Sequence, residues 1–190
     1  MASRMTAADR RAQVLSVAAE EFAAHGLHGA STDIIARNAG ITAPYIFRMF
    51  GTKKALFLEL VETSFDRVTD AMLDAAAGET GLDALARMGR QYYELLTDTT
   101  NLLLQLQGFA ASGDIEVRDA VRARFARMWD SVADATGLDP VTIKSFLAFG
   151  MLLNAGAALD VAALDEPWAD GVQTLINPGL FEHITTETNR

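Results

Sequence analysis

The segment Thr32–Phe57 constrains what this chain can fold into more than any other part of the sequence. It opens with a short helical stretch of mostly apolar residues. Gly40 then stands where a sharp turn is needed, because glycine readily adopts left-handed backbone angles. Thr42 is a suitable N-cap for a second short helix, and Pro44 suits the first turn of that helix. Two short helices joined in this way predict a helix-turn-helix motif, whose second helix enters the major groove of DNA.

The spacing of apolar residues in the rest of the chain predicts an all-α protein. Apolar residues recur every three or four positions over long stretches, and only four prolines occur in 190 residues. Gly26 is expected to end the first helix. We expect helices at about 7–24, 32–38, 43–50, 53–76, 82–97, 100–111, 114–136, 140–162 and 166–176.

Charge divides the chain into two parts. The net charge of −9, taken alone, is unsuited to a DNA-binding protein. Residues 1–56, however, carry seven basic and four acidic side chains, a net charge of +3, which leaves −12 on the remainder. A basic head on an acidic body suits local contact with phosphate groups. We therefore predict a DNA-binding domain at 1–56 and a ligand-binding and dimerisation domain at 57–190; ordinary scatter of charge is the alternative.

Composition excludes several other classes of protein. The chain has no cysteine, so disulfides, thiolate zinc sites and cysteine nucleophiles are excluded, which fits the reducing cytoplasm that we predict as its location. The N-terminus is polar and lacks the apolar core of a signal peptide. The longest apolar stretch, Phe146–Leu159, falls short of the roughly 20 residues that a membrane span needs. We expect no contact with a membrane.

We also expect no catalytic, cofactor or metal site. No grouping of serine, histidine and aspartate, no glycine-rich phosphate loop and no spaced pair of carboxylates is evident. His25 and His28 lie near Glu21, but no further metal ligand accompanies them. A helical-bundle carrier or enzyme without DNA regulation remains the alternative function, and it would require catalytic or cofactor-binding groups in the body.

With the motif in place, the chain resembles the TetR family of transcriptional regulators. The resemblance spans roughly residues 10–60 and rests on Thr32, Ile35, Ala36, Ala39, Gly40, Ile41, Thr42, Ile46, Phe50, Lys53, Ala55, Leu56 and Phe57. It implies an all-α fold with a three-helix head and a helical body. It also implies a homodimeric repressor that binds a near-palindromic operator. A small molecule held by the body would shift the two heads and release the DNA.

The second motif helix carries most of the candidate DNA contacts. We expect Ala43, Pro44 and Tyr45 to face base edges, where apolar surface can pack on thymine methyl groups. Arg48 would contact a phosphate or a guanine. Phe47 lacks the hydroxyl of the tyrosine that the family often places there, and Tyr45 is expected to supply that phosphate contact. Met49 also departs from the family pattern. The full predicted set is Ser31, Thr32, Thr42, Ala43, Pro44, Tyr45, Phe47, Arg48 and Lys53.

The other members of this set flank that helix. Lys53 precedes a long helix, so its charge and the helix dipole both favour a phosphate. Ser31 and Thr32 offer hydroxyl groups to phosphate, although capping of the first motif helix is an equal alternative.

Candidate ligand contacts are polar or aromatic residues on apolar body helices, because a ligand pocket combines an apolar wall with a few placed polar groups. These are Tyr92, Tyr93, Gln105, Phe109, Phe125 and Trp129, for which ordinary core or surface roles are the alternative. The helix expected at 140–162 is apolar nearly all round, so a second subunit is a candidate for covering it. Asn154, on that helix, is a candidate to pair across the dimer axis.

Overall fold

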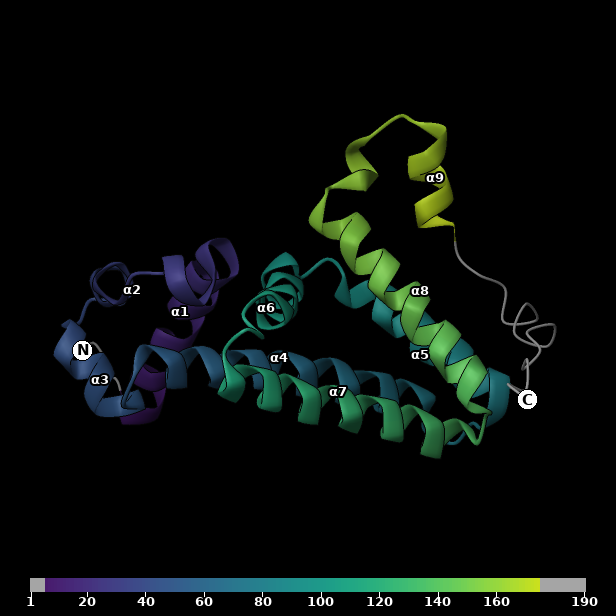
Figure 1. Cartoon of the computed structure of the whole chain (residues 1–190), viewed down its shortest axis with the longest axis horizontal. Helices are drawn as coiled ribbons and strands as arrows, with labels where there is room; N and C mark the ends of the chain where they lie inside the picture. The colour runs from purple at the N-terminus through teal and green to yellow at the C-terminus, as the bar shows by residue number, and fades with distance from the viewer. Residues whose placement is uncertain (1–5, 175–190) are drawn as a thin grey trace, which may run out of the picture. The chain divides into compact units, whose positions relative to one another are not determined.

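The structure is a computed structural model that describes residues 6–174 (Figure 1). Within this range the chain forms helices and no strand, as the sequence predicts. The elements are α1 (Ala7–Gly29), α2 (Thr32–Asn38), α3 (Ala43–Phe50), α4 (Lys53–Ala76), α5 (Gly81–Leu95), α6 (Thr99–Ala110), α7 (Ile115–Thr136), α8 (Pro140–Ala158), the 3-10 turn η1 (Val161–Ala163) and α9 (Pro167–Gln173).

The chain divides into two compact units that do not follow chain order. The first comprises the residues up to Ser64 together with Leu103–Ala123, and the second comprises Phe65–Leu102 together with the residues from Arg124 on. The first unit therefore contains the helix-turn-helix segment and most of α6. The assignment of DNA binding to 1–56 and of ligand binding and dimerisation to 57–190 concerns function, and it stays a prediction.

A single apolar core holds the helices of the first unit together. Phe22 of α1 meets Phe57 of α4 edge to face, with ring centroids 5.2 Å apart, and both side chains are fully buried. Ile35 of α2 and Ile46 of α3 are also buried. The two short motif helices are thus anchored on the two long ones. Because a helix of seven or eight residues is marginal alone, this burial is what keeps α2 and α3 folded.

The helical backbone of α1 is interrupted at Gly26, where the sequence predicts the end of the first helix. Gly26 is buried and adopts φ +66° and ψ −176°, which kinks the helix, and one more turn continues to Gly29. The N–H of Ala30 donates to the Gly26 carbonyl at 3.2 Å and closes this turn. The side chain of Gln107, on α6, donates to the Ala23 carbonyl at 3.2 Å, just before the kink. Gly26 therefore ends the regular part of α1, as the sequence predicts, and one separate helical turn follows it.

In the second unit, α8 packs against α5 and α9, as Figure 1 shows. Leu85 and Met88 of α5 and Ile143 of α8 are buried. Asp139 caps α8 by accepting the N–H groups of residues 141 and 142, and a hydrogen bond from the Thr142 hydroxyl lowers the pKa of Asp139. Pro140, directly after the cap, suits the first turn of the helix.

α8 is shorter than the predicted range of 140–162. It ends at Ala158, and Asp160 then adopts a left-handed conformation with φ +50° before η1 begins. α9 covers most of the last predicted helix, and the end of that prediction, residues 175 and 176, lies outside the described residues.

The apolar character of α8 is mostly unburied. Among the described helices, this 19-residue helix alone is long and apolar enough to cross a membrane by length and composition. α8 is longer than Phe146–Leu159, the longest apolar stretch in the sequence. Only 22% of its most apolar window is buried within the chain. A helix of this composition needs a further apolar surface to cover it.

Candidate DNA-binding surface

The turn between α2 and α3 is fixed by backbone hydrogen bonds. Gly40 adopts φ +66°, and its N–H donates to the Arg37 carbonyl at 3.1 Å. The N–H of Ile41 donates to the Ala36 carbonyl at 2.9 Å. Only glycine adopts this left-handed conformation without strain, so the turn follows directly from the residue at position 40. The helix-turn-helix segment is formed as the sequence predicts.

α3 presents one buried and one exposed face. Ile46 and Phe50 point into the core. Pro44, Phe47 and Arg48, spaced at i, i+3 and i+4, are exposed and share the opposite face. Phe47 keeps 40% of its surface exposed, a large fraction for a phenylalanine on a packed helix. The exposed face of α3, the predicted recognition helix, thus carries the apolar ring of Phe47 beside the cation of Arg48.

The start of α3 differs in one detail from the sequence prediction. Thr42 occupies the N-cap position, and its carbonyl accepts the N–H of Tyr45 at 3.0 Å. Its side chain, however, makes no capping hydrogen bond. Thr42 is exposed and Ala43 is half-buried. The Thr42 hydroxyl is therefore not used to hold the helix end.

Arg48 and Tyr45 form a stacked pair on α3. The guanidinium carbon of Arg48 lies 4.5 Å from the centroid of the Tyr45 ring, within the range of a cation–π contact. Tyr45 is half-buried and Arg48 is exposed. The ring therefore orients the guanidinium group. The predicted role of Tyr45 as the replacement phosphate donor is not tested by this contact, which uses the ring face and not the hydroxyl.

Ser31 performs the capping role that the sequence allowed for it. Its hydroxyl accepts the N–H of Ile34 at 3.4 Å, and its own N–H donates to the Glu21 carboxylate at 2.9 Å. Thr32 is the first residue of α2 and is half-buried. Phosphate contact by either residue stays a prediction.

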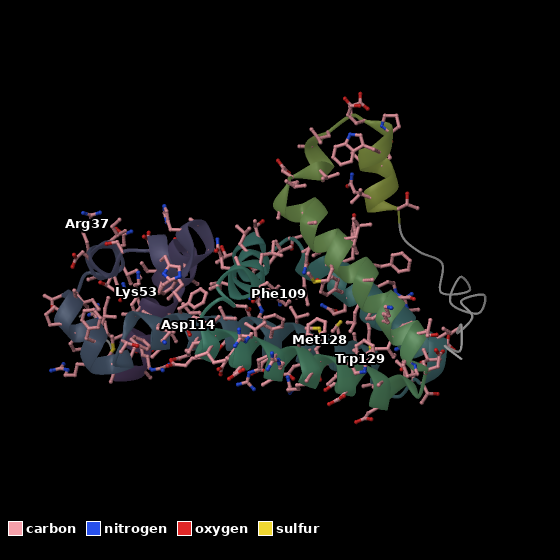
Figure 2. All side chains as sticks on the ribbon, viewed as in Figure 1. Arg37, Lys53, Phe109, Asp114, Met128 and Trp129 are labelled. Carbon is pink, nitrogen blue, oxygen red and sulfur yellow. The ribbon has the colours of Figure 1, made fainter. Side chains whose placement is uncertain are left out.

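Lys53, a predicted phosphate contact, also closes the end of α1. Its ammonium group donates to the His28 carbonyl at 3.2 Å and to the Ala30 carbonyl at 3.1 Å. An ammonium group has three N–H donors, so one remains for a further acceptor. The sequence indicated a charge at the start of α4 but not these carbonyl contacts, which link residues 23 and 25 positions apart. Figure 2 labels Lys53 near the motif helices.

Part of the positive charge counted in residues 1–56 is neutralised in the fold. Arg11 pairs with Glu59 at 2.7 Å. Lys54 pairs with Asp114 at 3.1 Å and with Glu116 at 2.9 Å. The Lys54 ammonium lowers the pKa of Asp114, and both carboxylates raise the pKa of Lys54, led by Glu116. All three acidic partners lie beyond residue 56, so a count along the sequence overestimates the free charge of the head.

Two cations on the motif helices stay exposed. One is Arg48, and the other is Arg37 in the last turn of α2, which projects away from that helix in Figure 2. Arg37 was not among the predicted contacts. In the sequence, Arg37 can be recognised as a basic residue in the last helical turn before Gly40. Arg37 extends the candidate surface from α3 onto α2.

The six predicted ligand contacts fall in both compact units. Gln105 and Phe109 belong to the first unit. Gln105 is only 4% exposed, and its side-chain N–H donates to the Ser64 carbonyl at 3.1 Å. Phe109 is half-buried on α6 (Figure 2). The amide N–H of Gln105 thus joins α6 to α4.

The other four predicted ligand contacts lie in the second unit. The Tyr92 hydroxyl donates to Oδ1 of Asn154 at 2.5 Å, and burial raises the pKa of Tyr92 against the opposing effect of this bond. Asn154 is thus bound within its own chain, contrary to the expectation that it pairs across a dimer axis. Tyr93 is 40% exposed, and Phe125 and Trp129 are half-buried on α7. Figure 2 labels Trp129.

Comparison with known proteins places the motif in a family. Residues 14–60, from α1 to the first turns of α4, match the bacterial regulatory proteins of the tetR family. The HTH-type transcriptional activator FasR of Mycolicibacterium smegmatis is 32% identical over 73 residues, which cover 38% of this chain and 33% of FasR. The match to this relative therefore spans only about a third of its length.

Solved structures extend the likeness of fold to most of the chain. A TetR-like transcriptional regulator from Rhodococcus sp. RHA1 has a TM-score of 0.67 at 22% identity, covering 94% of each chain. The regulator FadR from Bacillus subtilis, solved in complex with stearoyl-CoA, has a TM-score of 0.68 at 15% identity, covering 90% of this chain and 97% of FadR. The helix-turn-helix region of this chain therefore matches the tetR family of bacterial regulatory proteins, and the fold of most of the chain is like that of TetR-type transcriptional regulators.

Proposed function

We propose that this chain is a homodimeric repressor that binds a near-palindromic operator and leaves it when the body binds a small molecule. The observation that carries the proposal is that one chain exposes two unlike surfaces. α3 offers a cation and an apolar ring. The α8 and α9 region offers large apolar side chains. The first suits DNA, and the second suits another protein surface.

The apolar surface supports dimerisation. Met151, Leu152 and Leu159 of α8 and its C-terminal end are 38%, 50% and 71% exposed. Leu164 and Trp168, just beyond, are 42% and 53% exposed. Exposed apolar residues gathered in one region mark an interaction site, whereas single ones do not. A second copy of the same region covers this surface in a two-fold dimer, because a two-fold interface pairs the same patch from each subunit.

A two-fold dimer also explains why one short recognition helix is enough. Two copies of α3 related by a two-fold axis enter successive major grooves when they lie about 34 Å apart, one turn of DNA. The operator then carries two inverted half-sites. Each subunit alone makes few contacts, so the affinity of the pair depends on both heads being held at that spacing.

The effector is proposed to bind in the helical body and to change the spacing of the heads. FadR of Bacillus subtilis was solved with stearoyl-CoA, so a long-chain acyl-CoA is the first class of compound to test on this chain. The direction of regulation has one alternative, since FasR is named a transcriptional activator. Repression and activation share the same operator contact.

The test measures operator binding and its release with the purified full chain. DNA flanking its own gene is titrated in a gel shift, first alone and then with stearoyl-CoA. Selective binding that weakens at least tenfold with the acyl-CoA supports the proposal with this effector class. Selective binding that stearoyl-CoA leaves unchanged excludes long-chain acyl-CoA as the effector and still supports operator binding. Binding no tighter than to unrelated DNA contradicts the proposed operator.

A further inference from the structure

The exposed face of α3 is poor in groups that read bases by hydrogen bonding. Side-chain readout in the major groove relies mainly on arginine, lysine, asparagine, glutamine and the acidic residues, while a hydroxyl group such as that of the exposed Thr42, just before α3, discriminates less between bases. The sequence of α3 is Ala-Pro-Tyr-Ile-Phe-Arg-Met-Phe, in which Arg48 is the single member of that group. The Tyr45 ring is already covered by the Arg48 guanidinium. Hydrogen bonding by α3 therefore specifies few base pairs.

The same face carries two exposed apolar side chains instead. Pro44 and Phe47 are exposed, stand about one helical turn apart and share this face with Arg48. Phe47 exposes 40% of its surface, although Ile46 and Phe50 beside it are buried. An apolar strip on a helix that enters the major groove meets one apolar group on the bases, the C5 methyl of thymine. Cytosine carries only a hydrogen at C5, and the purines present hydrogen-bonding groups there.

We propose that α3 selects its operator mainly through thymine methyl groups, which Phe47 and Pro44 contact, and that Arg48, supported by Tyr45, reads one guanine in each half-site. The inference rests on the proposed operator binding and specifies what that binding recognises. It assigns to Phe47 a reading role in place of the phosphate contact expected at this position. It also moves Tyr45 from base contact to the support of Arg48.

The contact between Arg48 and Tyr45 explains why one arginine is enough for base recognition by hydrogen bonding. Its guanidinium carbon lies 4.5 Å from the centroid of the Tyr45 ring, and this contact favours one position of the group before DNA arrives. A guanidinium held in plane can donate two hydrogen bonds to O6 and N7 of one guanine. Lysine has no such planar fork, so Arg48→Lys keeps the charge and loses the paired donors.

The experiment uses the full chain and DNA of defined chemistry. Duplexes bound by the protein are first selected from a random library of about 30 base pairs, enough for two half-sites one turn apart. Each thymine of the selected half-site is then replaced by deoxyuridine, which lacks the C5 methyl group and pairs identically. We expect binding to weaken about fourfold for each contacted thymine, the effect of one buried methyl group.

Variants assign the effect to its side chains. Phe47→Ala is expected to lose the difference between thymine and deoxyuridine at one position or more in each half-site. Arg48→Lys is expected to relax the preference for guanine while the sensitivity to deoxyuridine persists. Ile115→Ala is the matched control, because Ile115 is an equally apolar and 55% exposed residue on α7 of the same unit. Ile115→Ala is expected to keep the wild-type ratio of affinities for the thymine and deoxyuridine duplexes.

The outcomes separate this inference from the proposed function. A selected sequence that tolerates deoxyuridine throughout overturns the methyl readout and leaves operator binding intact. A deoxyuridine effect that Phe47→Ala does not change overturns the role of Phe47. Failure to enrich any sequence contradicts operator binding itself, and the inference with it. Should Phe47→Ala prove unfolded by circular dichroism, Phe47→Ser decides the role of Phe47, and the wild-type deoxyuridine titration still decides the methyl readout.

Discussion

α3 and α8 handle apolar residues in opposite ways. α3 has eight residues, buries Ile46 and Phe50, and presents a cation and a phenyl ring to solvent. α8 has 19 residues, buries few of its large apolar side chains, and leaves Met151 and Leu152 exposed. α3 is stabilised by the core beneath it, whereas α8 leaves much of its apolar surface exposed. The difference indicates two kinds of partner, a polyanion for α3 and an apolar surface for α8.

The two regions also differ in how their charges are used. In the first unit, acidic residues beyond position 56 neutralise Arg11 and Lys54, which concentrates the exposed charge on Arg37 and Arg48. In the second unit, Arg127 binds Asp66 at 3.0 Å and Asp70 at 2.6 Å, and these contacts connect α7 to α4. Removing charge is therefore expected to affect DNA binding at α3 and structure at α7.

The largest expected effect comes from removing the cations next to the motif. Arg48→Ala combined with Lys53→Ala should weaken operator binding about a thousandfold, since each subunit loses a bidentate base contact and a phosphate contact. A gel shift at fixed salt measures the loss, and sedimentation should show that the dimer persists. Unchanged affinity would place the DNA contact elsewhere.

The two cations need separate treatment, because Lys53 also binds two backbone carbonyls. Arg48→Ala alone should reduce affinity with little change in thermal stability, since Arg48 is exposed. Lys53→Met should lower the melting temperature as well. Equal melting temperatures for the two variants would show that the carbonyl contacts of Lys53 contribute nothing.

The next largest effect tests the apolar surface of α8. Leu152→Glu places a charge in the middle of the proposed interface, and we expect monomers in sedimentation velocity. Operator affinity should fall about a hundredfold, because the two heads then bind as separate molecules. Ile115→Glu, an equally drastic change at an exposed apolar residue of α7, is the control and should stay dimeric. A dimer of unaltered size would remove α8 from the interface.

A smaller effect is expected at the kink of α1. Gly26→Ala forces a side chain into φ +66° and brings its Cβ to 2.6 Å from the Gln107 amide oxygen. We expect a loss of about 2 kcal/mol in the free energy of unfolding, measured by denaturant titration. Adding Gln107→Ala relieves the contact but not the backbone strain, so recovery should be partial. Full recovery would show that the left-handed backbone costs nothing.

The smallest expected effect is spectroscopic. Trp129 is half-buried on α7, so an effector that binds beside it should change its fluorescence. Trp168, which is 53% exposed, contributes a background that Trp168→Phe removes. Stearoyl-CoA is the first compound for this titration. No change at a concentration that releases DNA would place Trp129 in ordinary core and outside the ligand site.

Much of this architecture follows from local sequence. The left-handed turn at Gly40 and the cap of α8 at Asp139 depend on neighbouring residues, and both can be predicted from side-chain type. Apolar periodicity likewise predicts the helices. It predicts the break at Gly26 but misses the extra helical turn that follows it up to Gly29. Asp160 ends α8 early in a conformation that aspartate adopts uncommonly, and no strong signal precedes it.

The details of the candidate site were less predictable, because they depend on contacts between distant residues. Lys53 binds carbonyls at the end of α1, and Gln105 donates to α4, 41 residues away. The neutralisation of Lys54 needs Asp114, which is 60 residues away. The exposure of Phe47 depends on which side of α3 meets the core. The sequence pattern identifies α3 as the candidate DNA-binding surface. Contacts between distant residues then determine which side chains of this surface stay exposed.

We expect the helix-turn-helix of this chain to bind DNA selectively through α3. The most direct test titrates the full chain with DNA flanking its own gene and with a shuffled duplex of equal composition, at two salt concentrations. We predict binding to the flanking DNA at least a hundredfold tighter than to the shuffled duplex, and a fall in affinity for both as salt rises. Equal affinity for the two duplexes at both salt concentrations would contradict the claim.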